Sequence, residues 1–158
     1  MKQSKPSSKS VRVWLWVGGI LAGLLLLFVI ASGLMSSRMG GVPSGLDYST
    51  TRLSDKGLFR VSYTPSTGTV PINQMHQWTL HVETADGQPV DSATISVDGD
   101  MPQHGHGMPT RPSVTKNLGN GDYLVEGMKF QMGGWWLVDF TITADAQSDA
   151  AHFNMMLK

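Results

Sequence analysis

An uncharged apolar segment near the N-terminus limits what this chain can fold into. Charge is absent from Val13 to Ser37, and the stretch GGILAGLLLLFVIASGL within it is apolar almost throughout. As a helix, Val13–Met35 would be about 34 Å long, enough to cross the hydrocarbon core of a bilayer. A buried core helix is a poor alternative for so long a run without charge. We therefore predict a transmembrane helix over residues 13–35.

The residues that flank this segment predict its orientation. Residues 1–12 carry four basic side chains and no acidic one, and basic residues favour the cytoplasmic side of a membrane. Trp14 and Trp16 begin the apolar run, where indoles favour the headgroup level. We expect residues 1–12 to be a cytoplasmic basic tail of a single-pass protein of the inner (cytoplasmic) membrane. The C-terminal part of the chain would then lie in the periplasm.

A cleaved signal peptide is the competing interpretation of the apolar segment. Small residues at Ala31-Ser32-Gly33 have a spacing suited to cleavage. The apolar run is longer than the roughly 7–15 residues typical of a signal-peptide core, which favours an uncleaved anchor. Both interpretations export the rest of the chain. We expect a linker rich in Gly and Pro over residues 36–46 and an exported domain over residues 47–158.

The exported domain has the apolar pattern of β-strands. No stretch keeps a 3.6-residue apolar period over three turns, whereas Trp78, Leu80 and Val82 alternate with polar residues. Similar patterns predict strands at residues 58–63, 78–82, 93–97, 113–118, 123–125, 136–142 and 153–157. About seven short strands with regular turn signals are typical of an immunoglobulin-like β-sandwich. The expected large core side chains are Trp78, Tyr123, Trp136, Phe140 and Phe153.

The composition excludes several kinds of chemistry. The chain has no cysteine, so it has no disulfide, thiolate zinc site, iron–sulfur cluster or cysteine nucleophile. Ten methionines and five histidines are left as soft or borderline metal ligands. From Ser36 onward, eight basic residues stand against twelve acidic ones. With no basic patch in this part, we do not expect nucleic acid as a partner.

One segment concentrates histidine and methionine. Met101, His104, His106 and Met108 fall within eight positions, and Gly and Pro fill most of the positions between them, so we expect a loop rather than a strand or helix. Small residues allow tight turns that bring nearby side chains to one point. Imidazole and thioether ligands suit copper, Cu(I) above all, better than magnesium or calcium. Zinc more often recruits cysteine or a carboxylate.

A structural role is the alternative for this segment. A His-x-His pair alone is a weak indication of metal binding, and these side chains would also serve to close one end of the sandwich. A second methionine pair, Met128 and Met132, adds to the metal interpretation. We expect Met128 in the core and Met132 at a sandwich end, just before a long strand. The sequence leaves open whether that end also carries His104.

Two motifs in order carry a family resemblance. DMPQHGHGMPTRP (residues 100–112) and GDYLVEGMKFQMGGWWLV (residues 121–138) are similar to the YtkA-like domain, which occurs with small membrane-anchored proteins of the FixH type. The similarity covers about residues 95–143, is weaker back to Phe59, and does not include the tail from Gln147. It implies an exported immunoglobulin-like domain behind one helix, and a role in copper handling or respiratory-oxidase assembly. The motif positions carry over Met101, His104, His106, Met108 and Met132 as candidate metal ligands.

Two functions follow as hypotheses. The first is a periplasmic metal-binding module, with copper as the ion and a membrane metalloprotein or oxidase assembly complex as the partner. The second is a protein-interaction or assembly module without metal, for which Trp135 and Trp136 would supply an anchor, because tryptophan is enriched at interaction hot spots. We do not expect an enzyme, since the sequence lacks a nucleophile elbow and a phosphate-binding loop.

Overall fold

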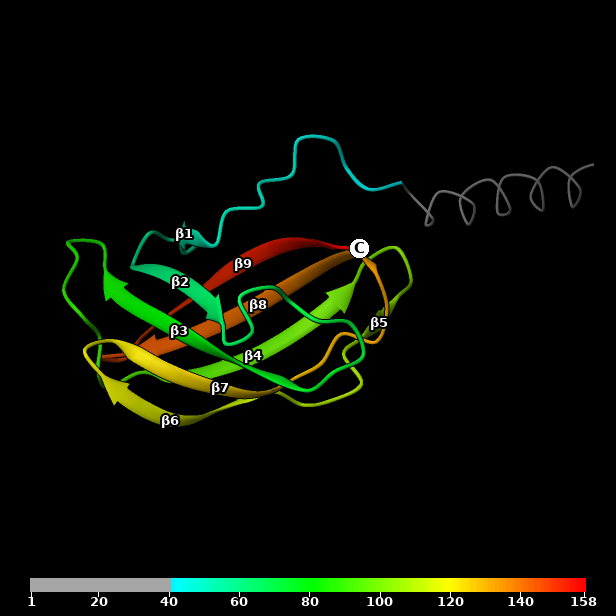
Figure 1. The fold of residues 1–158 in the computed structure, drawn as a ribbon. Helices are drawn as coiled ribbons and strands as arrows, with labels where there is room; N and C mark the ends of the chain where they lie inside the picture. The colour runs from blue at the N-terminus through cyan, green and yellow to red at the C-terminus, as the bar shows by residue number, and fades with distance from the viewer. Residues whose placement is uncertain (1–40) are drawn as a thin grey trace, which may run out of the picture. The chain divides into compact units, whose positions relative to one another are not determined.

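The computed structural model describes residues 41–158, which form nine β-strands (Figure 1). The predicted basic tail, the membrane helix and the first part of the linker lie outside the described residues. Within residues 41–158 there is no helix able to cross a membrane. The strands are β1 (Thr51–Leu53), β2 (Phe59–Pro65), β3 (His76–Thr84), β4 (Thr94–Met101), β5 (His106–Gly107), β6 (Ser113–Gly119), β7 (Asp122–Met128), β8 (Gly134–Ala144) and β9 (Gln147–Leu157).

The seven predicted strands correspond to the seven long strands, and β1 and β5 are additional. The expectation that the whole His- and Met-rich segment is a loop was wrong at β5, where His106 and Gly107 pair with the end of β4. Gly105 makes this pairing possible, since it adopts a φ of 66° that side-chain-bearing residues rarely take, and the chain turns back. β1 has only three residues, too few for an alternating pattern.

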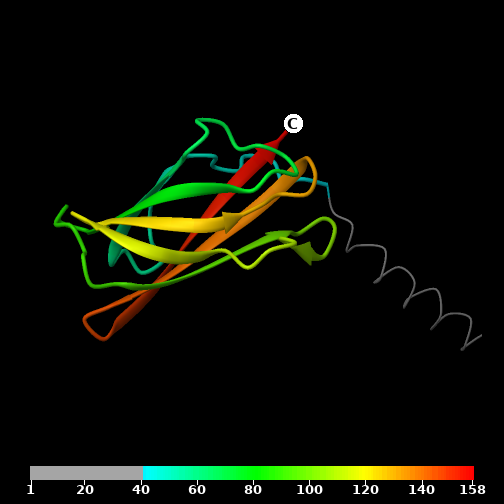
Figure 2. The same cartoon turned by 60° about the horizontal axis from the view of Figure 1, so that its bottom comes forward.

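The strands pair antiparallel in the order β1-β2-β3-β7-β6-β4-β8-β9, with β5 attached to β4. A single residue pair, Ser96 with Ser113, joins β4 to β6, so two layers of strands can be distinguished (Figures 1 and 2). The first and last strands also meet. Arg52 Nη1 donates to the His152 carbonyl at 2.7 Å, and the Asp55 N–H donates to the Ala150 carbonyl at 2.8 Å. The result is a mainly-β, nearly closed barrel or sandwich.

The core lies between the two layers and contains every large side chain predicted for it. Inward positions of β3, β7 and β8 alternate with outward ones, because successive side chains of a strand point to opposite faces. The largest fully buried side chains are Trp78, Trp136, Tyr123, Phe130, Phe140 and Phe153. Met128 is also fully buried, as expected. Aromatic rings run through this core in contact, with Tyr63 stacked on Trp78 at 4.3 Å between ring centroids.

Candidate metal centre

The histidine- and methionine-rich segment is a β-hairpin at one end of the sandwich. Met101 pairs with His106 and Asp100 with Gly107. In the turn, the backbone N–H groups of His104 and Gly105 both donate to the Met101 carbonyl at 2.9 Å. Cross-strand partners point to the same face of a sheet, so His106 lies on the side of the hairpin where Met101 enters the core. The hairpin thereby fixes the position of His106 relative to the core.

The two hairpin histidines lie beside each other. Their ring centroids are 5.7 Å apart, with 33° between the ring planes. His104 is exposed and His106 is half-buried. Two imidazoles that share one ion at metal–nitrogen distances near 2 Å have centroids about 5–6 Å apart. The ring separation of this pair lies within that range.

Trp136 connects the hairpin to the second motif. Its fully buried ring meets the His106 ring edge-on, with centroids 6.2 Å apart. Its Nε1–H donates to the Met132 carbonyl at 3.1 Å. The backbone of Met132 is thus at the same end of the sandwich as the hairpin, which answers the question that the sequence leaves open.

The predicted methionine ligands differ in accessibility. Met101 is fully buried, and its Cε lies 2.8 Å from where a Cβ on Gly134 would stand. Met108 is half-buried, and its Cε lies 2.7 Å from the corresponding point on Gly99. Both side chains therefore pack against a glycine, in the space that a Cβ would otherwise occupy. Met132 is 38% exposed, so its side chain is accessible from solution.

Gln131 is a residue of this region that the sequence reasoning missed. Its Nε2 lies 3.1 Å from Nδ1 of His106 and donates to the Gly107 carbonyl at 3.2 Å. The side chain is half-buried, and its Oε1 is buried without a hydrogen-bond partner. A lone glutamine has no distinctive spacing. Its place between Met128 and Met132, inside the second motif, is the one signal that pointed to it.

The two adjacent tryptophans have different environments. Trp135 is half-buried, and its Nε1–H donates to Asn154 Oδ1 at 2.9 Å. It is the cross-strand partner of Met156, which is 40% exposed. Trp136 has no exposed surface. Trp135 is therefore the accessible tryptophan of the two, and it lies beside Met156.

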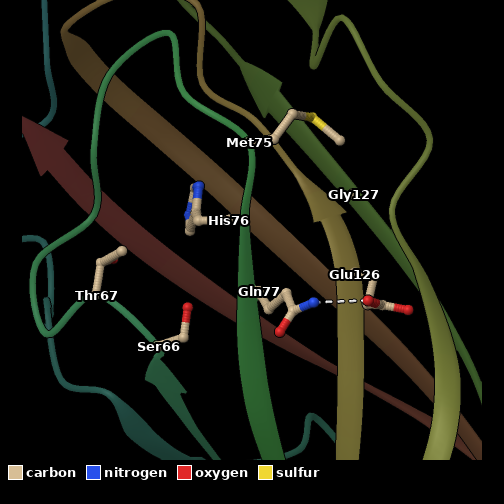
Figure 3. A pocket seen from close by; sticks show the side chains of 7 residues that line it. All are labelled: Ser66, Thr67, Met75, His76, Gln77, Glu126 and Gly127. Carbon is tan, nitrogen blue, oxygen red and sulfur yellow. Dashed lines mark hydrogen bonds between the residues drawn. The ribbon is translucent and has the colours of Figure 1, made fainter.

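A pocket of about 510 Å³ lies elsewhere, between the β2–β3 connection and β7 (Figure 3). His76 lines it and is 6% exposed, and its Nδ1 lies 3.1 Å from the Gln74 carbonyl oxygen. Burial lowers the pKa of His76, against a smaller opposite effect of this hydrogen bond, so the ring is neutral at pH 7. Met75 and His76 point to opposite sides of the strand in Figure 3 and do not converge on one point.

The donors of the hairpin region are imidazoles and thioethers. No three His, Asp or Glu side chains of residues 41–158 form a group suited to a metal ion. Besides these donors, the hairpin carries the carboxylate of Asp100, the cross-strand partner of Gly107. Imidazole and thioether are donors that soft ions such as Cu(I) favour.

The fold and the hairpin define a class of protein: a small antiparallel β-domain that presents a His-Gly-His hairpin beside a buried tryptophan. The family model described as YtkA-like matches residues 50–141, more than half of the chain, and the chain belongs to this family. The match begins near β1 and ends within β8, so it includes both motifs and the strands that position them. No curated protein and no solved structure matches the chain.

Proposed function

We propose that this protein is an exported, membrane-anchored module that binds copper as Cu(I). The observation that carries the proposal is the pair of hairpin imidazoles, His104 and His106, with ring centroids 5.7 Å apart. The absence of cysteine from the chain leaves imidazole and thioether as its soft donors. Copper is the cargo in this proposal, taken up at the hairpin and passed to a membrane metalloprotein or an oxidase assembly complex.

The ligands are proposed in two groups. His104 and His106 supply nitrogen ligands, and Met132, with its exposed thioether, is the first sulfur candidate. Met101 is fully buried and Met108 half-buried, so both are less accessible sulfur candidates than Met132. Because His104 is exposed at the hairpin turn, an acceptor protein can approach the ion from that side. Release to a partner is then a ligand exchange that starts at His104.

The proposal includes an architecture and a location. We propose that the two-layered β-domain is of the immunoglobulin-like type and that residues 13–35 anchor it as a single transmembrane helix, as in FixH-type proteins. The basic residues before this segment support a periplasmic domain. Tethering the domain to the membrane raises its effective concentration near membrane metalloproteins, which favours transfer without a high affinity.

Copper titration of the full chain in detergent micelles tests the proposal. Under reducing conditions, with a colorimetric Cu(I) chelator as competitor, we expect one ion bound per chain. The double variant His104→Ala/His106→Ala should lose at least 10-fold in affinity, since both proposed nitrogen ligands are removed. His81→Gln is the matched control, because His81 lies on β3 and pairs with Asp122 away from the hairpin. Unchanged Cu(I) affinity in the double variant would refute the proposal.

An assembly module without metal is the second candidate. It is favoured by the half-buried Trp135 and the exposed Met156, which are neighbours across β8 and β9. Co-purification with a membrane complex that survives both a chelator and the double histidine change, and is lost in Trp135→Ala, would support this candidate over copper binding.

A further inference from the structure

The two ends of the β-domain differ in charge. Figure 1 shows β5 and the C-terminus at one end, the hairpin end, and the β8–β9 turn at the other. At the hairpin end, the connections and the residue after β9 contain no acidic residue and three basic ones: Arg111, Lys129 and Lys158. At the opposite end, the connections contain one basic residue, Lys56, and four acidic ones: Asp55, Asp86, Asp91 and Asp145.

Exposed apolar side chains also gather at the hairpin end. Trp135 and Met156 are cross-strand partners, and Tyr48 lines a hollow of about 550 Å³ together with Met156. Ile72 Cδ1 lies 3.6 Å from where a Cβ on Gly133 would stand, and Met132 immediately precedes this glycine. We call these five side chains the apolar patch: Tyr48, Ile72, Met132, Trp135 and Met156. Trp135 is half-buried and the other four are 36–46% exposed, so the patch is open to a partner.

The chain enters the domain beside this patch. Asn154 Nδ2 donates to the Asp47 carbonyl at 3.2 Å, and the next residue is Tyr48 of the patch. Residues 36–46, between the proposed membrane helix and Asp47, span at most about 40 Å when fully extended. If residues 13–35 cross the bilayer, Asp47 therefore stays within this distance of the membrane surface, and the patch lies next to it.

A bilayer surface with anionic headgroups matches both features of the hairpin end. Tryptophan and tyrosine favour the headgroup level, and aliphatic side chains favour the boundary between headgroups and acyl chains. Basic residues near such a surface are attracted to anionic lipids. The opposite end carries more carboxylates than basic side chains in its turns, so the same lipids repel it.

We propose that the apolar patch docks on the surface of the anchoring membrane, with Arg111, Lys129 and Lys158 facing anionic phospholipid headgroups. This inference rests on the membrane anchor in the proposed function and is independent of copper binding. It adds an orientation to that function. In the docked state the hairpin with His104 and His106 lies near the bilayer, where a membrane metalloprotein would receive the ion.

Nitroxide labelling of the metal-free full chain in nanodiscs tests the inference. Because the chain has no cysteine, one substitution introduces one label. The patch is labelled at Met156→Cys. The matched control is Leu118→Cys, since Leu118 is 47% exposed, against 40% for Met156, and lies near the opposite end of the domain on β6. The measured quantities are the collision rates of each label with oxygen, which is enriched in lipid, and with a water-soluble nickel chelate.

In nanodiscs of mixed phosphatidylcholine and phosphatidylglycerol, we expect the label at Met156→Cys to collide mainly with oxygen and the label at Leu118→Cys mainly with the chelate. The double variant Lys129→Gln/Lys158→Gln should lower the ratio of docked to free domain by about 10- to 30-fold, read from the two components of the label's spectrum. Lys56→Gln/Lys116→Gln removes as much charge away from the hairpin end and should leave this ratio unchanged.

Equal collision of the two labels with the nickel chelate would overturn the inference and leave the patch to a protein partner. Equal immersion of both labels would also overturn it, because docking would then have no preferred end. A full chain that does not enter nanodiscs would refute the proposed anchor separately. The labelled chains added to vesicles of the same mixed lipids then test the patch alone, and immersion at Met156→Cys but not at Leu118→Cys would support docking.

Discussion

At the scale of single residues, Gly121 has no room for a side chain. Its φ is 78°, and an added Cβ would overlap the carbonyl oxygen of Val82. Its own carbonyl accepts from the Val82 N–H at 2.8 Å, and its N–H donates to Asp91 Oδ1 at 2.6 Å. The β6–β7 turn is therefore pressed against β3, and glycine is required for both space and conformation.

We expect Gly121→Ala to lower the free energy of unfolding by more than the roughly 1–2 kcal/mol that a left-handed conformation costs a residue with a Cβ. Gly68→Ala is the matched control, since Gly68 has a φ of 74° and open space where its Cβ would stand. Urea unfolding measures both variants. Equal losses in the two would show that the contact with Val82 does not matter.

At the scale of elements, the β1–β2 turn is fastened to β9 by Asp149. This buried carboxylate accepts from the Lys56 N–H at 3.0 Å and from the Leu58 N–H at 3.4 Å. Burial raises its pKa, but hydrogen bonds from Ser54 and the backbone outweigh this effect and lower the pKa below 3.8. Asp149 therefore contributes stability above pH 3.8, which is lost as the pH falls through its lower folded-state pKa.

Asp149→Asn should cost about 1–3 kcal/mol at pH 7, because an amide nitrogen would face backbone donors. Urea unfolding at pH 7 and pH 3 measures the loss. It should shrink at the lower pH, because below 3.8 the unfolded wild type takes up a proton on this carboxylate more readily than the folded protein does. Asp145→Asn, in the exposed β8–β9 turn, should be nearly neutral. A loss that stays equal at both pH values would contradict the role given to the charge.

His152 also connects β9 to the β1–β2 turn, and its contribution to stability has the opposite pH dependence. Its Nδ1 lies 2.5 Å from Asp139 Oδ1 and its Nε2 3.0 Å from Asp55 Oδ2, while Arg52 donates to its carbonyl. The hydrogen bond to Asp139 raises the pKa of His152, against a smaller effect of burial, and Asp55 raises it further. The charged ring thus contributes stability that is complete below the usual pKa of about 6.5 and is lost as the pH rises through the raised value.

We therefore expect the wild type to lose stability between pH 6 and pH 9 relative to His152→Gln, which does not titrate. The Tm of both proteins across this range is the measurement. Parallel Tm curves would show that the charge on His152 does not contribute to the junction.

At the scale of the whole molecule, core and candidate site share Trp136. Its ring packs against Phe130 at 5.0 Å in the core and against His106 at 6.2 Å in the hairpin. Trp136→Phe removes the Nε1–H that binds the Met132 carbonyl and leaves space beside His106. We expect a loss of about 1–3 kcal/mol and weaker Cu(I) binding, measured by unfolding and chelator competition. Trp135→Phe is the control. Equal effects of the two variants on Cu(I) binding would show that Trp136 has no role of its own at the candidate site.

Much of the β-structure could be predicted from the sequence because strand periodicity is local. The alternation around Trp78 and Trp136 located β3 and β8, and Met155 and Met156 point to opposite faces, one buried and the other exposed, as a regular strand requires. The family was also visible in the sequence, in two motifs that the family model includes. These features depend on residues next to one another in the chain.

The tertiary structure decided the rest, because it depends on contacts between distant residues. Three contacts have no local sequence pattern that could predict them. β5 pairs with β4, Arg52 donates to the His152 carbonyl, and Gln131 contacts His106. Register and loop packing are set by the fit of whole layers, which a period of two cannot encode. The apolar segment 13–35 remains a prediction of the sequence. The sequence by itself thus determined a β-domain of the YtkA-like family, and the fold decided which side chains surround its histidine pair.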